Sequence, residues 1–142
     1  MTVFVDITAA IMAVLNAAPA ISDNVFRARD RAMAEEYSTA INVQVSDSTP
    51  FVVAINGAPI DWETTVTIEC YAKSSTTSGD LAVDPILAAV FARVSANPSL
   101  NGTIGWIEPK GFKFEFDSQG HKTGWVGMTY SAHHRTSNMT LD

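Results

Sequence analysis

The first hydrophobic pattern in the chain has the period of a helix. Between residues 3 and 17, apolar side chains recur every three or four positions and would form one stripe on a helical surface. These positions are Phe4, Ile7, Ile11 and Val14, with Leu15 widening the stripe. Pro19 follows and cannot continue a helix. The pattern predicts a helix over residues 3–17 that packs its apolar stripe on a core.

Several later segments alternate apolar and polar residues, which is typical of strands with one buried face. The clearest spans residues 62–72, where Val66 and Ile68 share one face and Thr65 and Thr67 share the other. β-branched side chains dominate this segment, as a pleated surface prefers. The same reasoning predicts strands at residues 25–29, 40–46, 103–116 and 122–134.

A second helical pattern covers residues 81–96. Pro85 fits only its first turn, where the missing N–H costs nothing, and Pro98 lies just beyond its end. The resulting order predicts an α+β fold, with a single mixed or antiparallel sheet of four to five strands and two helices packed on one face. We expect residues 1–142 to form one domain, because this length suits a single core and no linker is visible.

The composition adds that the protein is acidic. A formal net charge of −6 disfavours broad, sequence-independent binding of nucleic acid, which needs a basic footprint, although a local basic patch is compatible with it. The apolar run at residues 7–20 is too short to span a bilayer, and no Lys or Arg precedes it. We therefore expect synthesis in the cytoplasm and no membrane partner.

Residues able to carry catalysis or bind a metal do not converge in the pattern. His133 and His134 are adjacent, so in a strand they point to opposite faces and cannot readily share one metal. Cys70 shares a face with aliphatic positions, which favours a small buried hydrophobe over a reactive thiol. Glu63 and Glu69 would lie about 20 Å apart on one strand face, too far for paired acid–base catalysis. We expect no cofactor, no metal and no enzymatic activity.

The strongest charge feature is a row of arginines with a spacing of two. They are Arg27, Arg29 and Arg31. On a strand they would share one face and form either a solvated edge that blunts aggregation or a basic strip for an acidic partner or passing nucleic acid. The adjoining residues 30–39 have no stable period and carry Glu35 and Glu36, so we expect a mobile loop that contributes contact residues.

Aromatic side chains among hydroxyls on the outer sheet face predict a protein interface. Tyr71 and Trp125 fall on that face, and both residue types are enriched at interfaces. Alternatively, Trp125 covers a hairpin locally. His133, expected to face outward near Trp125, and Arg135 are expected to be touched by a neighbouring molecule.

The second half of the chain has a distinctive order of segments. It runs through "WETTVTIECYAKS", "DLAVDPILAAVFARVSAN", "LNGTIGWIEPKGFKFEFDSQG" and "GWVGMTYSAHHRT". This order resembles the tail terminator proteins of long-tailed bacteriophages, the lambda-like minor tail protein U group. The N-terminal helix and the strand at Val25 also sit where that family has theirs, whereas "PFVVAINGAPI" departs from its pattern.

The resemblance implies a structural virion protein with no catalytic residues to carry over. Such a protein forms a ring, usually a hexamer, in the neck region of the virion tail, at the head-proximal end of the tail tube. Its partners would be other copies of itself, the tail tube protein and a head completion or connector protein, while DNA passes through the lumen without specific binding. Two alternatives stay open: another phage neck or tail component, such as a head-closure or tube protein, and a small α+β enzyme or ligand-binding domain.

Overall fold

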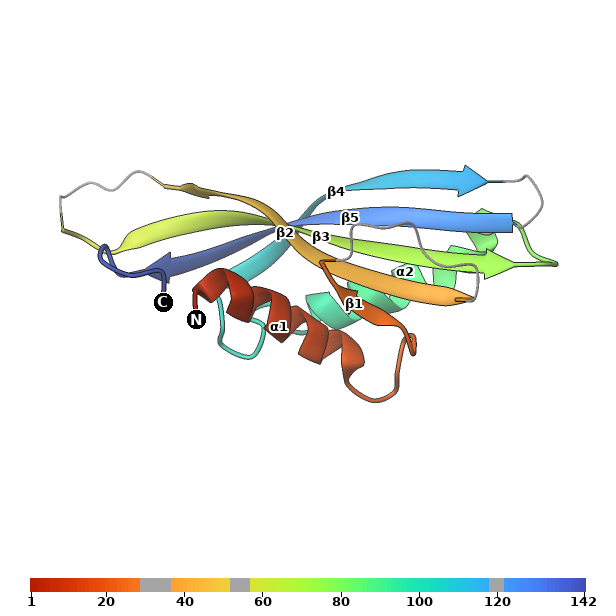
Figure 1. Cartoon of the computed structure of the whole chain (residues 1–142), viewed down its shortest axis with the longest axis horizontal. Coiled ribbons are helices and arrows are strands. Elements are labelled where there is room, and N and C mark those ends of the chain that lie inside the picture. Colours follow the sequence, from red (N-terminus) through yellow and green to blue (C-terminus); the bar gives the residue numbers. More distant parts are fainter. Residues whose placement is uncertain (29–36, 52–56, 118–121) are drawn as a thin grey trace.

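The computed structural model describes residues 1–28, 37–51, 57–117 and 122–142. In chain order its elements are α1 (Val3–Asn16), β1 (Val25–Arg27), β2 (Thr39–Pro50), β3 (Ile60–Ser74), α2 (Gly79–Ser95), β4 (Trp106–Asp117) and β5 (Lys122–Thr136). The strands form one five-stranded sheet of order β1-β2-β3-β5-β4 (Figure 1). β1 pairs with β2 in parallel and the other pairs are antiparallel, which confirms the predicted α+β fold with a mixed sheet.

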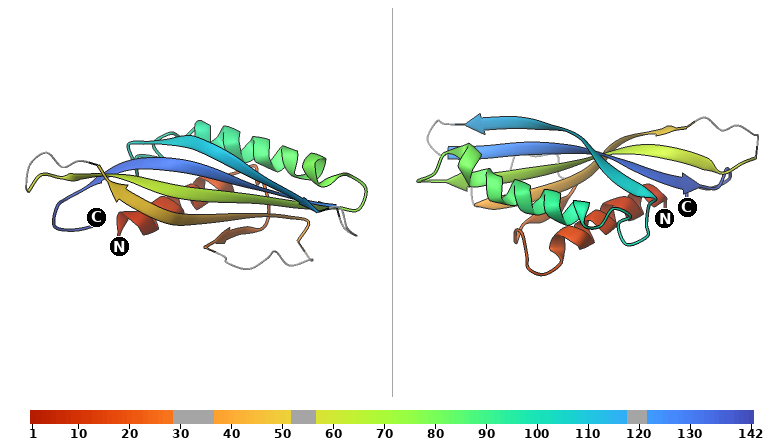
Figure 2. Two further views of the ribbon diagram at one scale, coloured as in Figure 1. Left: turned by 90° about the horizontal axis from the view of Figure 1, so that it is seen from above. Right: turned by 180° about the vertical axis from the view of Figure 1, so that it is seen from behind.

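Both helices lie on the same face of the twisted sheet (Figure 2). The core forms between them, because the helical stripes and alternate strand residues are all buried there. Ile7 and Ile11 of α1, Val90 of α2 and Ile68 of β3 have no exposed surface. The predicted helical stripe and the predicted faces of β3 are therefore confirmed, and the opposite sheet face carries no helix within the described ranges.

Two features hold the helices in place. The guanidinium of Arg93 in α2 donates hydrogen bonds to the carbonyl oxygens of Leu15 at 3.2 Å, Ala17 at 2.6 Å and Pro19 at 2.6 Å, where α1 ends. At the other end of α2, Gly79 packs directly on the main chain of β5 at Gly124, and a Cβ on either glycine would overlap main-chain atoms of the other segment. The second contact is possible because neither position carries a side chain.

A bulge in β4 changes which face its side chains occupy. Trp106 is opposite His133 in β5, but the register shifts between Pro109 and Gly111, and Phe112 is then opposite Met128. Since alternate residues of β5 face opposite sides, the single extra residue moves the following phenylalanines to the helix side of the sheet. Pro109 also suits an outermost strand, where one main-chain edge needs no donor.

β4 begins three residues later than the predicted strand over residues 103–116. The preceding segment folds as tight turns, in which the N–H groups of Gly102 and Ile104 both donate to the carbonyl oxygen of Ser99. Leu100 has a φ of 48°, and its fully buried side chain anchors the turn. The other strands are found where they were predicted, with β2, β3 and β5 longer and β1 shorter than expected.

The two ends of the chain lie close together (Figure 1). The N–H of Val3 donates to the carbonyl oxygen of Leu141 at 2.7 Å. In the part of the chain that the structure describes, neither helix combines the length and apolarity that crossing a membrane requires.

Candidate interaction surfaces

Of the charged residues predicted as contacts in the N-terminal half, the structure describes only Arg27. It ends β1, is exposed, and its Nη2 donates to the carbonyl oxygen of Val5 in α1 at 3.0 Å. The others lie outside the described residues: Arg29, Arg31, Glu35 and Glu36. A shared face for the three arginines therefore stays a prediction.

Tyr71 and Trp125 are brought together on the sheet face opposite the helices. They are cross-strand partners in the β3–β5 pairing, and both are half-buried. The indole of Trp125 also lies over Gly127 of its own strand, where a Cβ would come within 2.9 Å of the ring. The aromatic pair exists as predicted, and part of the Trp125 surface is used locally.

His133 is not the outward contact residue that the sequence suggested. Its side chain lies on the predicted face, but it is only 8% exposed. The imidazole stacks on Trp106, with ring centroids 4.3 Å apart, and on Phe51 at 5.7 Å. It also lies far along β5 from Trp125, which pairs with Tyr71 and not with the partners of His133. His133 is buried because two rings cover it, one from β4 and one from the residue after β2.

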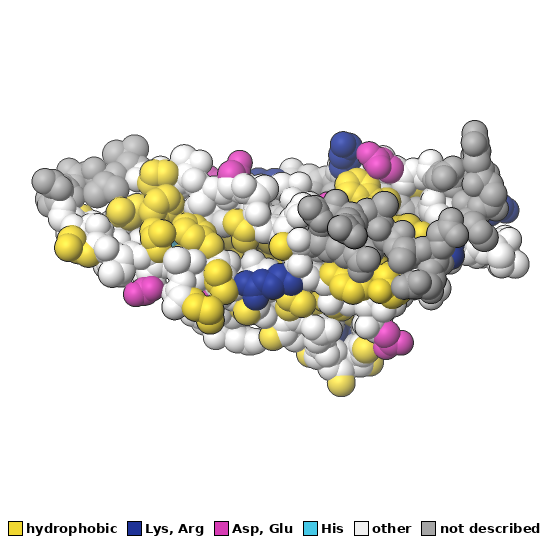
Figure 3. Space-filling model, viewed as in Figure 1, with side chains coloured by type: hydrophobic (Ala, Val, Ile, Leu, Met, Phe, Trp, Pro, Cys, Tyr) yellow, Lys and Arg dark blue, Asp and Glu magenta, His cyan; other side chains and the backbone are white. Residues whose placement is uncertain are grey.

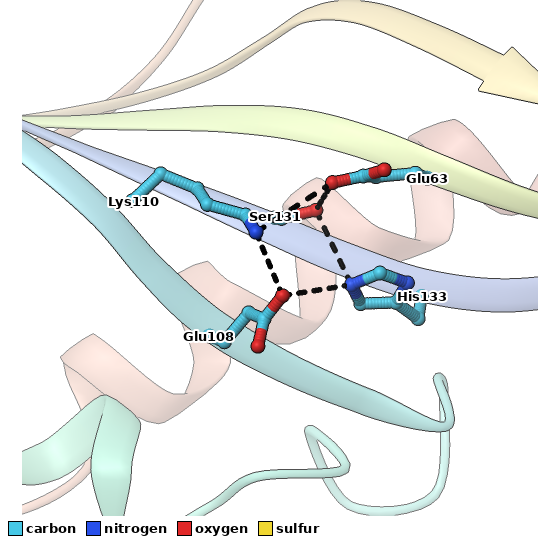
Figure 4. A network of polar contacts seen from close by, with 5 residues as sticks. All are labelled: Glu63, Glu108, Lys110, Ser131 and His133. Carbon is cyan, nitrogen blue, oxygen red and sulfur yellow. Dashed lines mark hydrogen bonds and ion pairs between the residues drawn. The ribbon is translucent and has the colours of Figure 1, made fainter.

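Polar groups surround the edge of the His133 ring (Figure 4). Its Nε2 lies 3.2 Å from Glu108 Oε1 and 3.4 Å from Ser131 Oγ. Ser131 Oγ donates to Glu63 Oε1 at 2.6 Å, and Lys110 Nζ lies 2.9 Å from Glu108 Oε1 and 3.9 Å from Glu63. Hydrogen bonds from Lys110 and then His133 lower the pKa of Glu108, and the Glu108 carboxylate raises the pKa of Lys110. Three strands contribute to this network, which ties β3, β4 and β5 together.

The network does not have the geometry of a hydrolytic triad. A serine nucleophile must give its proton to a histidine whose other nitrogen is held by an acid. Here Ser131 donates to Glu63, and the same Nε2 of His133 meets both Ser131 and Glu108. Among the residues that the structure describes, Nδ1 of His133 is buried without a hydrogen-bond partner, so no acid in that part of the chain orients it. This cluster fits a structural role better than catalysis.

His134 points to the helix side, as adjacency on a strand requires. Its Nε2 lies 2.6 Å from Thr64 Oγ1, which is 2.7 Å from Ser48 Oγ, and Phe4 of α1 meets the ring edge-on. Burial, and to a smaller extent His133, lowers the pKa of His134. The two histidines therefore do not converge, and no group of three or more metal-binding side chains occurs within the described segments.

An apolar cavity of about 480 Å³, here called the aromatic pocket, opens beside these histidines. It is lined by Phe51, Asp61, Trp62, Gly105, Trp106, His133, His134 and Arg135. Phe51 is 45% exposed and Trp106 is 52% exposed. Hydrophobic side chains are also visible on the surface at the end of the molecule where β2 ends and β3 begins (Figure 3). The Arg135 guanidinium forms a fork with Asp61, at 2.7 Å from Nε and 3.1 Å from Nη2, which lowers the pKa of Asp61. Arg135 is exposed at the rim, as expected of a contact residue.

A second apolar surface lies along β4 and α2, and we call it the aromatic ridge. It consists of Phe91, Phe112, Phe114 and Phe116, whose successive ring centroids are each 6.2 Å apart. The four side chains are 38% to 54% exposed, and Asp84, Leu87 and Ala88 complete a groove of about 300 Å³ beside them. Sequence reasoning recognised that the β4 phenylalanines share a face but did not assign them a role. The available signal was Pro109 with Gly111, which mark an outermost strand with a bulge.

Comparisons with known proteins agree with this architecture. A chain from the virion of a native gene transfer agent particle superposes with a TM-score of 0.59 and 11% identity, covering 91% of this chain and 94% of that chain. At that identity the likeness concerns the fold alone. No curated protein matches the sequence. The family model described as phage minor tail protein U matches residues 4–134, from α1 to near the end of β5. The chain therefore belongs to the phage minor tail protein U family.

Proposed function

We propose that this chain is a tail terminator. Residues 1–142 act as one structural domain, copies of which form a ring at the head-proximal end of the tail tube. The ring stops polymerisation of the tube protein and presents its other side to a head completion or connector protein. It makes and breaks no covalent bond, needs no cofactor, and works in the neck of the virion tail after synthesis in the host cytoplasm.

The observation that carries the proposal is the family match, which spans nearly the whole chain. The structure supports it with two exposed aromatic surfaces that a protein working alone would leave in contact with water. A closed ring needs two different matching patches on each subunit, and the chain has more than one candidate.

In this proposal, the predicted contact residues lie where neighbouring subunits or other tail proteins can bind them. Tyr71, Trp125 and Arg135 lie on the sheet face without helices, where a partner can reach them. Arg27 is exposed at the end of β1. In the proposal, the arginine row faces either the lumen, through which DNA passes without specific binding, or an acidic neighbour.

The test is removal of the gene from the phage or prophage that encodes it, followed by electron microscopy of the particles. A terminator predicts headless tails of uncontrolled length together with tail-free heads, and a copy of the gene supplied in trans should restore normal particles. Tails of normal length would refute termination. Filled heads lacking tails, with tails of regulated length, would favour a head-closure protein. A tube protein would instead polymerise alone into filaments.

A further inference from the structure

The aromatic pocket and the aromatic ridge lie at opposite ends of β4. Trp106 begins the strand and borders the pocket, whereas Phe116 lies near its other end and closes the ridge. Ten residues of extended chain separate them, or about 33 Å. The same outermost strand therefore carries a hollow apolar surface at one end and a projecting one at the other.

The two surfaces are both apolar and aromatic, so their chemistry is compatible. The pocket offers an apolar hollow of about 480 Å³ walled by aromatic rings, and Phe114 and Phe116 are projecting rings that are each more than half exposed. Aromatic side chains that fill a partner's pocket supply a large part of the binding energy at protein interfaces.

The charges beside the two surfaces are complementary. Asp84 borders the ridge groove, is exposed, and has no ion pair among the described residues. Arg135 at the pocket rim uses Nε and Nη2 for Asp61, which leaves the donors of Nη1 without a partner in the described part of the chain. A copy that places its ridge in the pocket of another copy could therefore bring a carboxylate to a guanidinium with free donors.

We propose that the aromatic ridge of one copy docks into the aromatic pocket of the next copy. This inference rests on the proposed function only in that a ring requires such a head-to-tail contact. Because the ridge and pocket are different surfaces, each copy still has a free ridge and a free pocket after the first contact, so association continues until the ring closes. A surface that matched only itself would stop at a dimer.

Disulfide trapping tests the contact on the full-length protein. Cys70 is fully buried and burial raises the pKa of its thiol to about 12, so the native cysteine should not form cross-links in the folded protein. Phe114→Cys protein is mixed with Trp106→Cys protein and oxidised, which should give a covalent dimer of the two variants. Phe51→Cys serves as a second pocket-side position, so that a folding defect at Trp106 does not decide the result.

The matched control is Lys113→Cys. Lys113 is more exposed than Phe114 and adjacent to it, but points to the other face of β4, so it should cross-link to the pocket-side cysteines much more weakly. The double variant Trp106→Cys/Phe114→Cys should give a ladder of covalent oligomers ending at the ring. In the protein without added cysteines, Phe114→Ser should weaken self-association about tenfold or more, whereas Lys113→Ser should not.

Three outcomes would overturn the inference. Phe114→Cys that cross-links chiefly to itself would show a two-fold contact, and a double variant that stops at a dimer would show two β4 edges pairing with each other. The absence of any cross-link would remove the contact altogether, because trapping captures even transient encounters.

Rings seen by electron microscopy without these cross-links would refute the interface and leave tail termination intact. Normal tails after gene removal, with the cross-link ladder present, would refute termination and leave the interface intact.

Discussion

Replacing Gly124 with alanine should destabilise the protein far more than the same change at Gly111. A Cβ at position 124 would overlap the carbonyl oxygen of Gly79 and come within 3.0 Å of the Cβ of Val83. The first turn of α2 would then have to move away from β5. At Gly111, in the outermost strand, nothing lies within 4 Å of an added Cβ.

The size of the effect follows from which atoms collide. Overpacking of a close-packed interior costs about 1–3 kcal/mol, and main-chain atoms cannot rotate aside as a side chain can, so we expect about 3 kcal/mol for Gly124→Ala. At Gly111 the backbone is not in the left-handed region, and an alanine there reduces the freedom of the unfolded chain. Gly111→Ala should therefore be neutral or stabilise by up to about 1 kcal/mol.

Urea unfolding followed by tryptophan fluorescence and circular dichroism measures this difference. With a denaturant dependence of about 1–3 kcal/mol/M, a loss of about 3 kcal/mol in Gly124→Ala should lower the midpoint by about 1–3 M at an unchanged slope. Gly79→Ala should behave similarly, and the double variant should cost less than the sum, because one displacement of α2 relieves both overlaps. A free energy of unfolding for Gly124→Ala within about 0.5 kcal/mol of that for Gly111→Ala would show that α2 does not approach β5 in this way.

Three further predictions concern the C-terminal end of α1, the buried thiol of Cys70 and the buried histidine His134. Arg93→Ala should lower the free energy of unfolding by about 2 kcal/mol, because three carbonyl oxygens where α1 ends lose a charged donor. Arg93→Lys should recover only part of this stability. Equal urea midpoints for the wild type and both variants would contradict the prediction. Cys70 should react with a thiol reagent only after unfolding, because it is fully buried, and stoichiometric labelling of the native protein would show otherwise. The pKa of His134 in the folded protein is lowered below 6.5, so the unfolded chain takes up a proton at higher pH than the folded one. The free energy of unfolding should therefore decrease as the pH falls below 6.5. His134→Gln should reduce this loss, as measured by urea unfolding at about pH 7.5 and about pH 5.5, and an unchanged pH dependence would count against it.

The local parts of the fold could be read from the sequence. Alternation in β3 depends only on neighbouring residues facing opposite sides, so Val66 and Ile68 were correctly placed in the core. The stripe of α1 was equally readable. The burial of His133 was not, because it depends on Phe51 and Trp106, which reach the ring through the pairing of separate strands.

The bulge in β4 was hidden for a related reason. Alternation alone would place Trp106, Phe112 and Phe116 on one face, since all three have even numbers. Which strand pairs with β4, and in which register, decides that an extra residue is inserted between Pro109 and Gly111. The aromatic ridge was consequently not expected as a surface beside α2, although its phenylalanines were known to share a face.

The extra residue in β4 also determines how this region can change over evolutionary time. Because Lys110 sets the phase of everything that follows it, a one-residue deletion there would rotate the distal phenylalanines towards the threonine-bearing side and expose the flank of α2. Exchanges of one amino acid for another would alter a single position and leave the phase intact. Natural variants of this strand should therefore differ in residue identity while its length stays constant.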